Sequence, residues 1–286
     1  MSVQDVYHYG TEHYDHHRRQ LTRSVSTFLL IGAMKAGTTS LYRYLSNHPQ
    51  VFMSSPKELD YFVTELNLDR GLDWYLSHFA EARNDQVAIG EASTSYTKHP
   101  MYPGVAERVA ALLPDVKLVY VVREPIARMK SHYLHELSKG REKKPINEAL
   151  LNDPRYITCS SYAMQLEQYL EHFDRARILV VTAEELGAQR DRTVGKVLEH
   201  LGVSTSWRDP VLDRSFNTTD RRRVIRPFEH RLRRVPGFKQ AMRITPKALK
   251  HRVRRFTTRP IDDELQRAVI EDAHGRGGYT PHPLGV

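Results

Sequence analysis

The segment 29-LLIGAMKAGTTSLYRYL-45 decides the fold, because an apolar run passes here through a glycine-bearing turn into an amphipathic stretch. Residues 27–32 have the composition of a buried parallel strand, and residues 38–47 predict a helix with Leu41 and Leu45 on one face. A strand, a turn with glycines and the start of a helix together favour the binding of a phosphate. The segment therefore predicts an α/β phosphate-binding domain.

The turn departs from the nucleoside-triphosphate pattern G-x-x-x-x-G-K-[ST] in the position of its lysine. Gly32 and Gly37 have the required spacing, but Thr38 follows Gly37, and Lys35 lies two residues before it. Backbone N–H groups at the helix start, the hydroxyl groups of Thr38 and Thr39 and the charge of Lys35 could together bind an anion. An ordinary strand-to-helix turn capped by a threonine is the alternative for this segment alone.

The rest of the chain alternates between apolar runs and amphipathic stretches, which predicts a central parallel β-sheet flanked by crossover helices. We expect one P-loop-like α/β domain over 26–286, preceded by a polar N-terminal arm at 1–25 and containing a basic helical C-terminal segment at 221–259. Further strands are expected at 86–90, 116–122 and 176–182, and helices at 104–113, 124–139, 161–173, 190–201 and 261–273.

The formal net charge of +9 comes from one part of the chain. Residues 221–259 hold 15 Lys and Arg against one acid, Glu229, so the remainder of the chain is net acidic. The global charge is therefore poor evidence for nucleic acid, and we expect no nucleic-acid partner. The basic segment could contact an anionic membrane surface, or it could be a solvated helical face.

The single cysteine, Cys159, excludes an intrachain disulfide and a cysteine-based zinc cluster, which favours a reducing compartment. The N-terminus has no apolar region of a secretory signal, and no run reaches the ~18 apolar residues of a membrane span. We therefore expect a soluble, cytoplasmic protein. The N-terminal arm carries four histidines without an accompanying acidic or cysteine pattern, so a surface arm is favoured over a metal site there; they are His8, His13, His16 and His17.

Two further motifs add functional side chains. The strand at 116–122 leads into Arg123, at the carboxyl end where open α/β sheets bind ligands, and Ser131 follows eight residues later. Together they could hold one phosphate by charge and by hydroxyl group. The segment 56-PKELDYF-62 carries an acid, Glu58, among aromatic and polar neighbours. Taken alone, each motif is better explained by surface residues without a shared function.

In combination the motifs K-x-G-T-T, P-K-E-x-x-Y-F and V-V-R-E-P-x-x-R-x-x-S resemble the sulfotransferases that use 3′-phosphoadenosine 5′-phosphosulfate (PAPS). The chain looks closest to the heparan-type, carbohydrate branch and its bacterial relatives. The resemblance runs from about residue 27 to 202, through 162-YAMQLEQYLEHF-173 and 178-ILVVTAEEL-186. It implies transfer of a sulfuryl group to a hydroxyl of a carbohydrate, glycolipid or small metabolite, with adenosine 3′,5′-bisphosphate as product and no metal required.

The resemblance also implies roles for residues. Lys35 would contact the oxygen that bridges phosphorus and sulfur, the loop would cradle the 5′-phosphate, and Arg123 with Ser131 would hold the 3′-phosphate. Glu58 would be the catalytic base, assisted by Lys35. The implied donor-binding set is Lys35, Ala36, Gly37, Thr38, Thr39, Ser40, Arg123, Ser131, Tyr162, Arg221 and Arg222.

Two departures from the family pattern leave the acceptor open. Ala92, in 90-GEASTSY-96, stands where heparan-type enzymes carry a lysine, and the single cysteine excludes their disulfide-closed loop. The basic tract 221–226 could supply the missing positive charge. Glu91 is a lesser candidate for a role on the substrate side. Three histidines are alternative candidates for the base, as in the aryl sulfotransferases, although none has matching surroundings; they are His48, His99 and His132.

Two other functions compete with this interpretation. A P-loop kinase or NTPase needs a lysine directly after Gly37 and an acid at a strand end to hold Mg²⁺. The chain has Thr38 and Arg123 in those places. A non-enzymatic protein that binds anionic surfaces through 221–259 is the second alternative.

Overall fold

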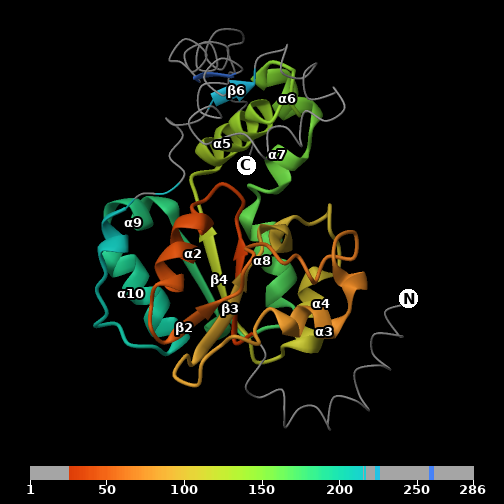
Figure 1. The fold of residues 1–286 in the computed structure, drawn as a ribbon. Coiled ribbons are helices and arrows are strands. Elements are labelled where there is room, and N and C mark those ends of the chain that lie inside the picture. The colour runs from red at the N-terminus through yellow and green to blue at the C-terminus, as the bar shows by residue number, and fades with distance from the viewer. Residues whose placement is uncertain (1–25, 215, 217–222, 226–257, 261–286) are drawn as a thin grey trace, which may run out of the picture. The chain divides into compact units, whose positions relative to one another are not determined.

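The computed structural model describes residues 26–214, 216, 223–225 and 258–260 (Figure 1). Its centre is a sheet of five parallel strands in the order β2-β3-β1-β4-β5. This confirms the expected α/β class with a central parallel sheet. The strands are β1 (Phe28–Gly32), β2 (Val51–Met53), β3 (Ala88–Ala92), β4 (Lys117–Val122) and β5 (Ile178–Thr182).

The described residues divide between two compact units. The sheet belongs to the unit formed by 26–129 and 155–216, and the second unit holds 130–154 with 223–225 and 258–260. The first boundary falls within helix α5 (Pro125–Ser138). The single domain expected over 26–286 stays a prediction, and the expected arm at 1–25 lies outside the described residues.

Helices cover both faces of the sheet (Figure 1). On one face lie α2 (Thr38–Ser46), α9 (Ala183–Ala188) and α10 (Arg190–Leu201), and on the other lie α3 (Leu72–Ser77), α4 (Val105–Leu112) and α8 (Tyr162–Leu170). Because both faces are covered, the strands are mostly apolar, and every residue of β1 and β3 is buried, including Glu91 of β3. The expected helices that became α2, α4, α5, α8 and α10 are confirmed within a few residues at their ends.

Shorter elements were not predicted from the sequence. These are β2, α3, α9, α6 (Ile146–Asn152), α7 (Arg155–Thr158) and four 3-10 turns, η1 (Leu68–Arg70), η2 (Thr94–Thr97), η3 (Arg175–Arg177) and η4 (Pro210–Asp213). The strand expected at 86–90 begins and ends two residues later, because Val87 is exposed and the Gln86 side chain instead donates a hydrogen bond to the carbonyl of Val51. The shift places Glu91 inside the strand.

The order of the strands fixes where ligands can bind. β1 lies between β3 and β4. The next two strands of the chain, β2 and β3, lie on one side of β1 within the sheet, and β4 and β5 lie on its other side. Ligands of such sheets bind beyond the carboxyl ends of the strands at this reversal. The segment after β1 and Arg123 after β4 both lie at this edge.

One glycine in this region is required by close packing. The Thr97 hydroxyl in η2 donates a hydrogen bond to the carbonyl of Ile31 at 3.0 Å. A Cβ on Gly32 would lie 2.1 Å from that same hydroxyl oxygen. Glycine at the end of β1 therefore lets η2 pack directly against the strand.

The second unit contains local contacts of its own. The Tyr133 hydroxyl donates to the carbonyl of Lys144 at 3.0 Å, and Arg141 forms an ion pair with Glu136 at 2.6 Å. Strand β6 (Arg223–Ile225) pairs with β7 (Thr258–Pro260) in antiparallel fashion.

Strand β6 corrects the helical prediction for residues 223–225, where two consecutive β-branched residues, Val224 and Ile225, favour a strand. The remaining expected helices at 226–257 and 261–273 lie outside the described residues. Among the described helices, none is long and apolar enough to cross a membrane.

Candidate active site

The loop between β1 and α2 has the backbone geometry of an anion-binding turn. Gly37 precedes the helix with φ 101° and ψ 8°, in the left-handed region that glycine tolerates, and Lys35 also has a positive φ of 72°. Gly37 has no side chain with which to cap the helix. In the first turn of α2, the N–H of Ser40 donates to the carbonyl of Gly37 at 2.9 Å. The N–H groups of Thr38 and Thr39 precede this first bond of the helix, so they can bind an anion beyond its start.

The predicted donor-binding residues of this loop share one turn but differ in exposure. Ala36 and Thr38 are buried, whereas Lys35, Thr39 and Ser40 are partly exposed. Ala36 can therefore contribute only backbone groups. The Ser40 hydroxyl donates a long hydrogen bond, 3.4 Å, to the carbonyl of Phe216, which leaves its oxygen able to accept.

Arg123 connects this loop with two other predicted residues. Its Nη1 donates to the carbonyl of Lys35 at 3.4 Å, and its backbone N–H donates to the hydroxyl of Tyr162 at 3.3 Å. Tyr162 also packs edge-to-face on Tyr120, with ring centroids 6.0 Å apart. Burial raises the pKa of the Tyr162 hydroxyl, so it stays protonated at neutral pH. Residues from three separate segments therefore meet beside the loop.

Arg128, the second arginine of the motif V-V-R-E-P-x-x-R-x-x-S, contacts the loop between β1 and α2. Its side chain is fully buried, and Nε donates to the Ser160 hydroxyl at 2.5 Å, Nη2 to the carbonyl of Tyr156 at 2.7 Å and Nη1 to the carbonyl of Met34 at 3.4 Å. Burial lowers the pKa of its guanidinium. Met34 belongs to the loop between β1 and α2 and precedes Lys35, whose carbonyl Arg123 contacts. Arg128 therefore supports this loop from a neighbouring residue. The spacing of five residues from Arg123 does not indicate this contact in the sequence.

The roles of the remaining predicted donor ligands stay predictions. Ser131 lies on α5 in the second compact unit, where it is buried, so its pairing with Arg123 stays a prediction. Arg221 and Arg222 lie outside the described residues.

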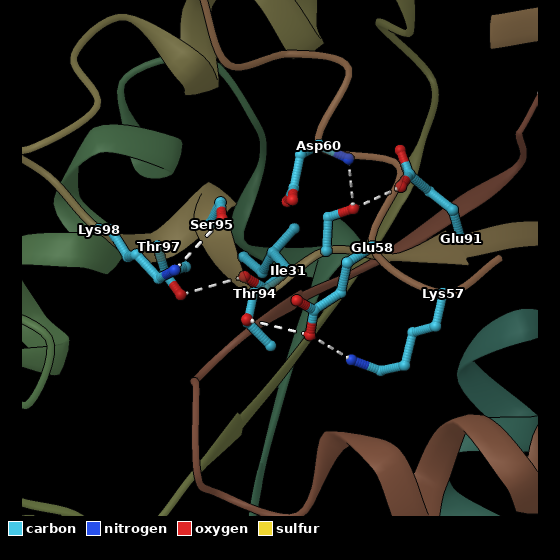
Figure 2. A network of polar contacts seen from close by, with 10 residues as sticks. Ile31, Lys57, Glu58, Asp60, Glu91, Thr94, Ser95, Thr97 and Lys98 are labelled. Atoms are coloured by element: carbon cyan, nitrogen blue, oxygen red, sulfur yellow. Dashed lines mark hydrogen bonds and ion pairs between the residues drawn. The ribbon is translucent and has the colours of Figure 1, made fainter. Parts of the chain in front are cut away.

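Glu58 lies in the loop that follows β2, and this loop is held against the end of β3. The backbone N–H of Glu58 donates to the carbonyl of Ala92 at 2.9 Å. Its Oε1 accepts from Lys57 Nζ at 2.7 Å and from the Thr94 hydroxyl at 3.3 Å (Figure 2). The side chain is 42% exposed, so the carboxylate is accessible to an acceptor.

The charge environment keeps Glu58 ionised. Partial burial acts to raise its pKa, but the ion pair with Lys57, the charge of Lys98 and the hydrogen bond from Thr94 outweigh it. The pKa of Glu58 is therefore lower than its ordinary value, and the side chain is a carboxylate at neutral pH.

Glu91 and His48 are not placed for direct chemistry. Glu91 is 0% exposed, which contradicts the substrate-side role considered from the sequence. His48 is buried; its Nε2 lies 2.9 Å from the carbonyl of Ser204, and its Nδ1 accepts from the N–H of Gln50. Both side chains are buried and hydrogen-bonded to other groups of the protein.

Comparison with known proteins identifies the family. Residues 26–226 match the family described as "Sulfotransferase domain", and the chain belongs to this family. This confirms the resemblance drawn from the motifs.

Individual relatives point to the same branch. The chain is 28% identical over 195 residues to the human bifunctional heparan sulfate N-deacetylase/N-sulfotransferase 3, a match that covers 62% of this chain and 22% of that protein. It is 32% identical over 185 residues to the human heparan sulfate glucosamine 3-O-sulfotransferase 3B1, covering 61% and 45% respectively. The matches therefore cover less than half of either relative.

A solved structure shares the fold over most of its length. The crystal structure of a sulfotransferase from Alicyclobacillus acidocaldarius superposes with a TM-score of 0.60 and 29% identity, covering 79% of this chain and 96% of that one. The five-stranded sheet with its flanking helices is thus a sulfotransferase fold.

Proposed function

We propose that this chain is a PAPS-dependent sulfotransferase that transfers the sulfuryl group to a hydroxyl acceptor. The observation that carries the proposal is the hydrogen bond from Arg123 to the carbonyl of Lys35, which joins the two motifs with phosphate-binding chemistry. Glu58 lies at the same edge of the sheet, since its N–H is bonded to the end of β3 beside β1. Family membership supports the same conclusion.

The residues present fit a donor with two phosphate groups. The N–H groups of Thr38 and Thr39 at the start of α2, the hydroxyl of Thr39 and the ammonium of Lys35 suit the 5′-phosphosulfate. Arg123 offers the charge for the second phosphate, with Ser131 as its expected partner. When bound, PAPS supplies an activated sulfuryl group with a phosphate as leaving group.

The transfer follows from the roles of two side chains. Glu58 accepts the proton of the acceptor hydroxyl while the acceptor oxygen bonds to sulfur and the bond from sulfur to the bridging oxygen breaks. Such a base contributes ~10²–10⁴-fold in rate. Lys35 stabilises the negative charge that develops on the departing phosphate oxygen. The products are a sulfated acceptor and adenosine 3′,5′-bisphosphate, and the charge balance needs no metal.

The acceptor is proposed as a class. A hydroxyl of a carbohydrate, glycolipid or small metabolite suits an accessible carboxylate base, and both human relatives are named for action on heparan sulfate. Ala92 in place of a lysine argues for an acceptor other than a heparan chain. Membrane contact through 221–259 and a cytoplasmic location stay predictions.

Ligand stabilisation of the full chain tests the donor. At a concentration of about 100 times Kd, adenosine 3′,5′-bisphosphate should raise the free energy of unfolding by about 2.7 kcal/mol. ATP with Mg²⁺ at the same concentration should do so much less, because it lacks a 3′-phosphate. Stabilisation by ATP without stabilisation by the bisphosphate would favour a P-loop NTPase and reject the proposal.

A further inference from the structure

Three consecutive residues at the end of β3 hold the loop that carries Glu58. The carbonyl of Ala92 accepts from the N–H of Glu58 at 2.9 Å, the Ser93 hydroxyl accepts from the N–H of Asp60 at 3.0 Å, and the Thr94 hydroxyl donates to Glu58 Oε1 at 3.3 Å. The conformation of the loop is thus imposed from the neighbouring strand.

The loop needs this support because its backbone is strained. Glu58 has φ 66° and Asp60 has φ 50°, and both are side-chain-bearing residues in the left-handed region. Such conformations cost free energy and persist where surrounding bonds enforce them. Without those bonds the Glu58 carboxylate would lose its fixed direction.

The bond to Asp60 depends on a carboxyl group deeper in the protein. Ser93 Oγ, which accepts from Asp60, donates its own proton to Glu91 Oε2 at 2.7 Å. The Tyr96 hydroxyl donates to the other oxygen, Glu91 Oε1, at 2.7 Å. Figure 2 shows Glu91 and Asp60 joined through this relay. Glu91 is fully buried, and the transfer chemistry does not use it.

We propose that Glu91 is a positioning residue that acts through Ser93 to hold the strained Glu58–Asp60 backbone in the conformation in which Glu58 can act as base. The inference rests on the proposed role of Glu58. It assigns a function to a buried acid that no acceptor can reach.

The relay requires the ionised form of Glu91. A carboxylate accepts hydrogen bonds at both oxygens, as Ser93 and Tyr96 need, whereas the protonated acid turns one oxygen into a donor. The Ser93 proton then loses its acceptor or must reorient, and Ser93 can no longer both accept from Asp60 and donate to Glu91 in the observed way.

Glu91 changes its charge in the neutral range. Its pKa is raised to about 7, chiefly by burial. The hydrogen bonds from Tyr96 and Ser93 lower the pKa in part, and the charge of the nearby Asp60 carboxylate contributes to raising it. Three tyrosines on separate elements also interact with Glu91; they are Tyr75 on α3, Tyr96 in η2 and Tyr169 on α8. Burial raises the pKa of each hydroxyl well above its ordinary value, so all three stay neutral. Asp60 is the remaining acid, and its pKa is raised by burial and by Glu58.

The pH dependence of turnover tests the proposal in the full chain. In the wild type we expect kcat to fall as the pH drops through about 7, with KM for PAPS unchanged. Glu91→Gln keeps the shape of the side chain but offers one acceptor oxygen instead of two. It should lower kcat at pH 8 about tenfold or more, because a displaced catalytic group reacts more slowly. It should also abolish the dependence of kcat on pH near pH 7. Ser93→Ala should do the same without altering the charge of the site.

Thr193→Val is the matched control, because it removes a buried hydroxyl on α10 that donates to the carbonyl of Gln189 at 3.0 Å, away from this loop. It should keep the wild-type pH profile. A wild-type profile in both Glu91→Gln and Ser93→Ala would overturn the proposal, since a purely structural role would affect stability alone.

Hydrogen exchange at the Asp60 amide provides a readout that needs no activity. We expect exchange to accelerate below about pH 7 in the wild type, after correction for intrinsic rates, and at every pH in Ser93→Ala. Unchanged protection in Ser93→Ala would overturn the relay. Accelerated exchange combined with full turnover of Glu58→Gln would reject Glu58 as base while supporting the relay, so the two ideas fail separately.

Discussion

Arg123 Nη1 donates a hydrogen bond to the carbonyl of Lys35 across 3.4 Å, although the two residues are 88 positions apart in the chain. The bond joins the end of β4 to the loop after β1 and uses one of the five N–H donors of the guanidinium. This connection places one fixed charge next to the anion-binding turn.

Arg123→Ala should weaken the binding of adenosine 3′,5′-bisphosphate. Loss of a hydrogen bond to a charged group costs about 1.5–3 kcal/mol, so Kd should rise roughly tenfold to a hundredfold. Titration calorimetry measures it, with Arg83→Ala as control, since Arg83 is an exposed arginine paired with Asp85. Equal affinities of Arg123→Ala and wild type would remove Arg123 from the donor site.

Glu58→Gln should separate binding from chemistry. The amide keeps the size of the side chain but cannot accept the acceptor proton, so kcat should fall by ~10²–10⁴-fold. The Kd of the bisphosphate should change little. Initial rates measure kcat, and calorimetry on the same preparation measures the Kd of the bisphosphate. Turnover close to that of the wild type would refute Glu58 as base.

Arg128→Met should destabilise the fold and the loop together. It removes the guanidinium donor from the carbonyls of Met34 and Tyr156 and from the Ser160 hydroxyl, which should cost at least about 2 kcal/mol of unfolding free energy. Urea denaturation measures the loss. Arg208→Ala, at an exposed arginine that donates to the carbonyls of Thr205 and Trp207 in its own turn, should change stability by less than about 0.5 kcal/mol. Similar losses in the two variants would contradict the support given to the loop by Arg128.

Glu91 should make stability depend on pH. Its pKa is about 7 in the fold against an ordinary 4.5, so the folded state binds this proton more tightly than the unfolded chain. The stabilisation is complete below about pH 4.5 and is lost as the pH rises to about 7. The loss is on the order of 3 kcal/mol. Relative to Glu91→Gln, wild-type unfolding free energy should fall across this window, and a constant difference would show that Glu91 does not titrate there.

The sequence predicted the parts of the site that follow from local pattern. The turn after β1 and the position of Arg123 after β4 could be predicted, because carboxyl ends of parallel strands share one edge. Their direct bond could not, since it depends on side-chain directions. The five-residue spacing of Arg128 from Arg123 gave no sign that its guanidinium turns inward to Met34.

Other features could not be predicted, because they depend on contacts between residues that are distant in the sequence. β2 has three residues, too few for a periodic pattern, and its place comes from pairing with β3. The role of Glu91 arises where β3 continues two residues beyond the predicted strand and meets the loop of Asp60. Residues 223–225 follow a basic pattern, yet they pair with 258–260 as a strand.

Transfer of labelled sulfate from PAPS to a panel of hydroxylated acceptors, read by mass spectrometry, tests the central claim most directly. We expect a sulfated product to form together with adenosine 3′,5′-bisphosphate in equal amounts, and both to disappear in Glu58→Gln. Release of inorganic phosphate from ATP by the same preparation, with no sulfated product from any sugar, glycolipid or small alcohol, would contradict it.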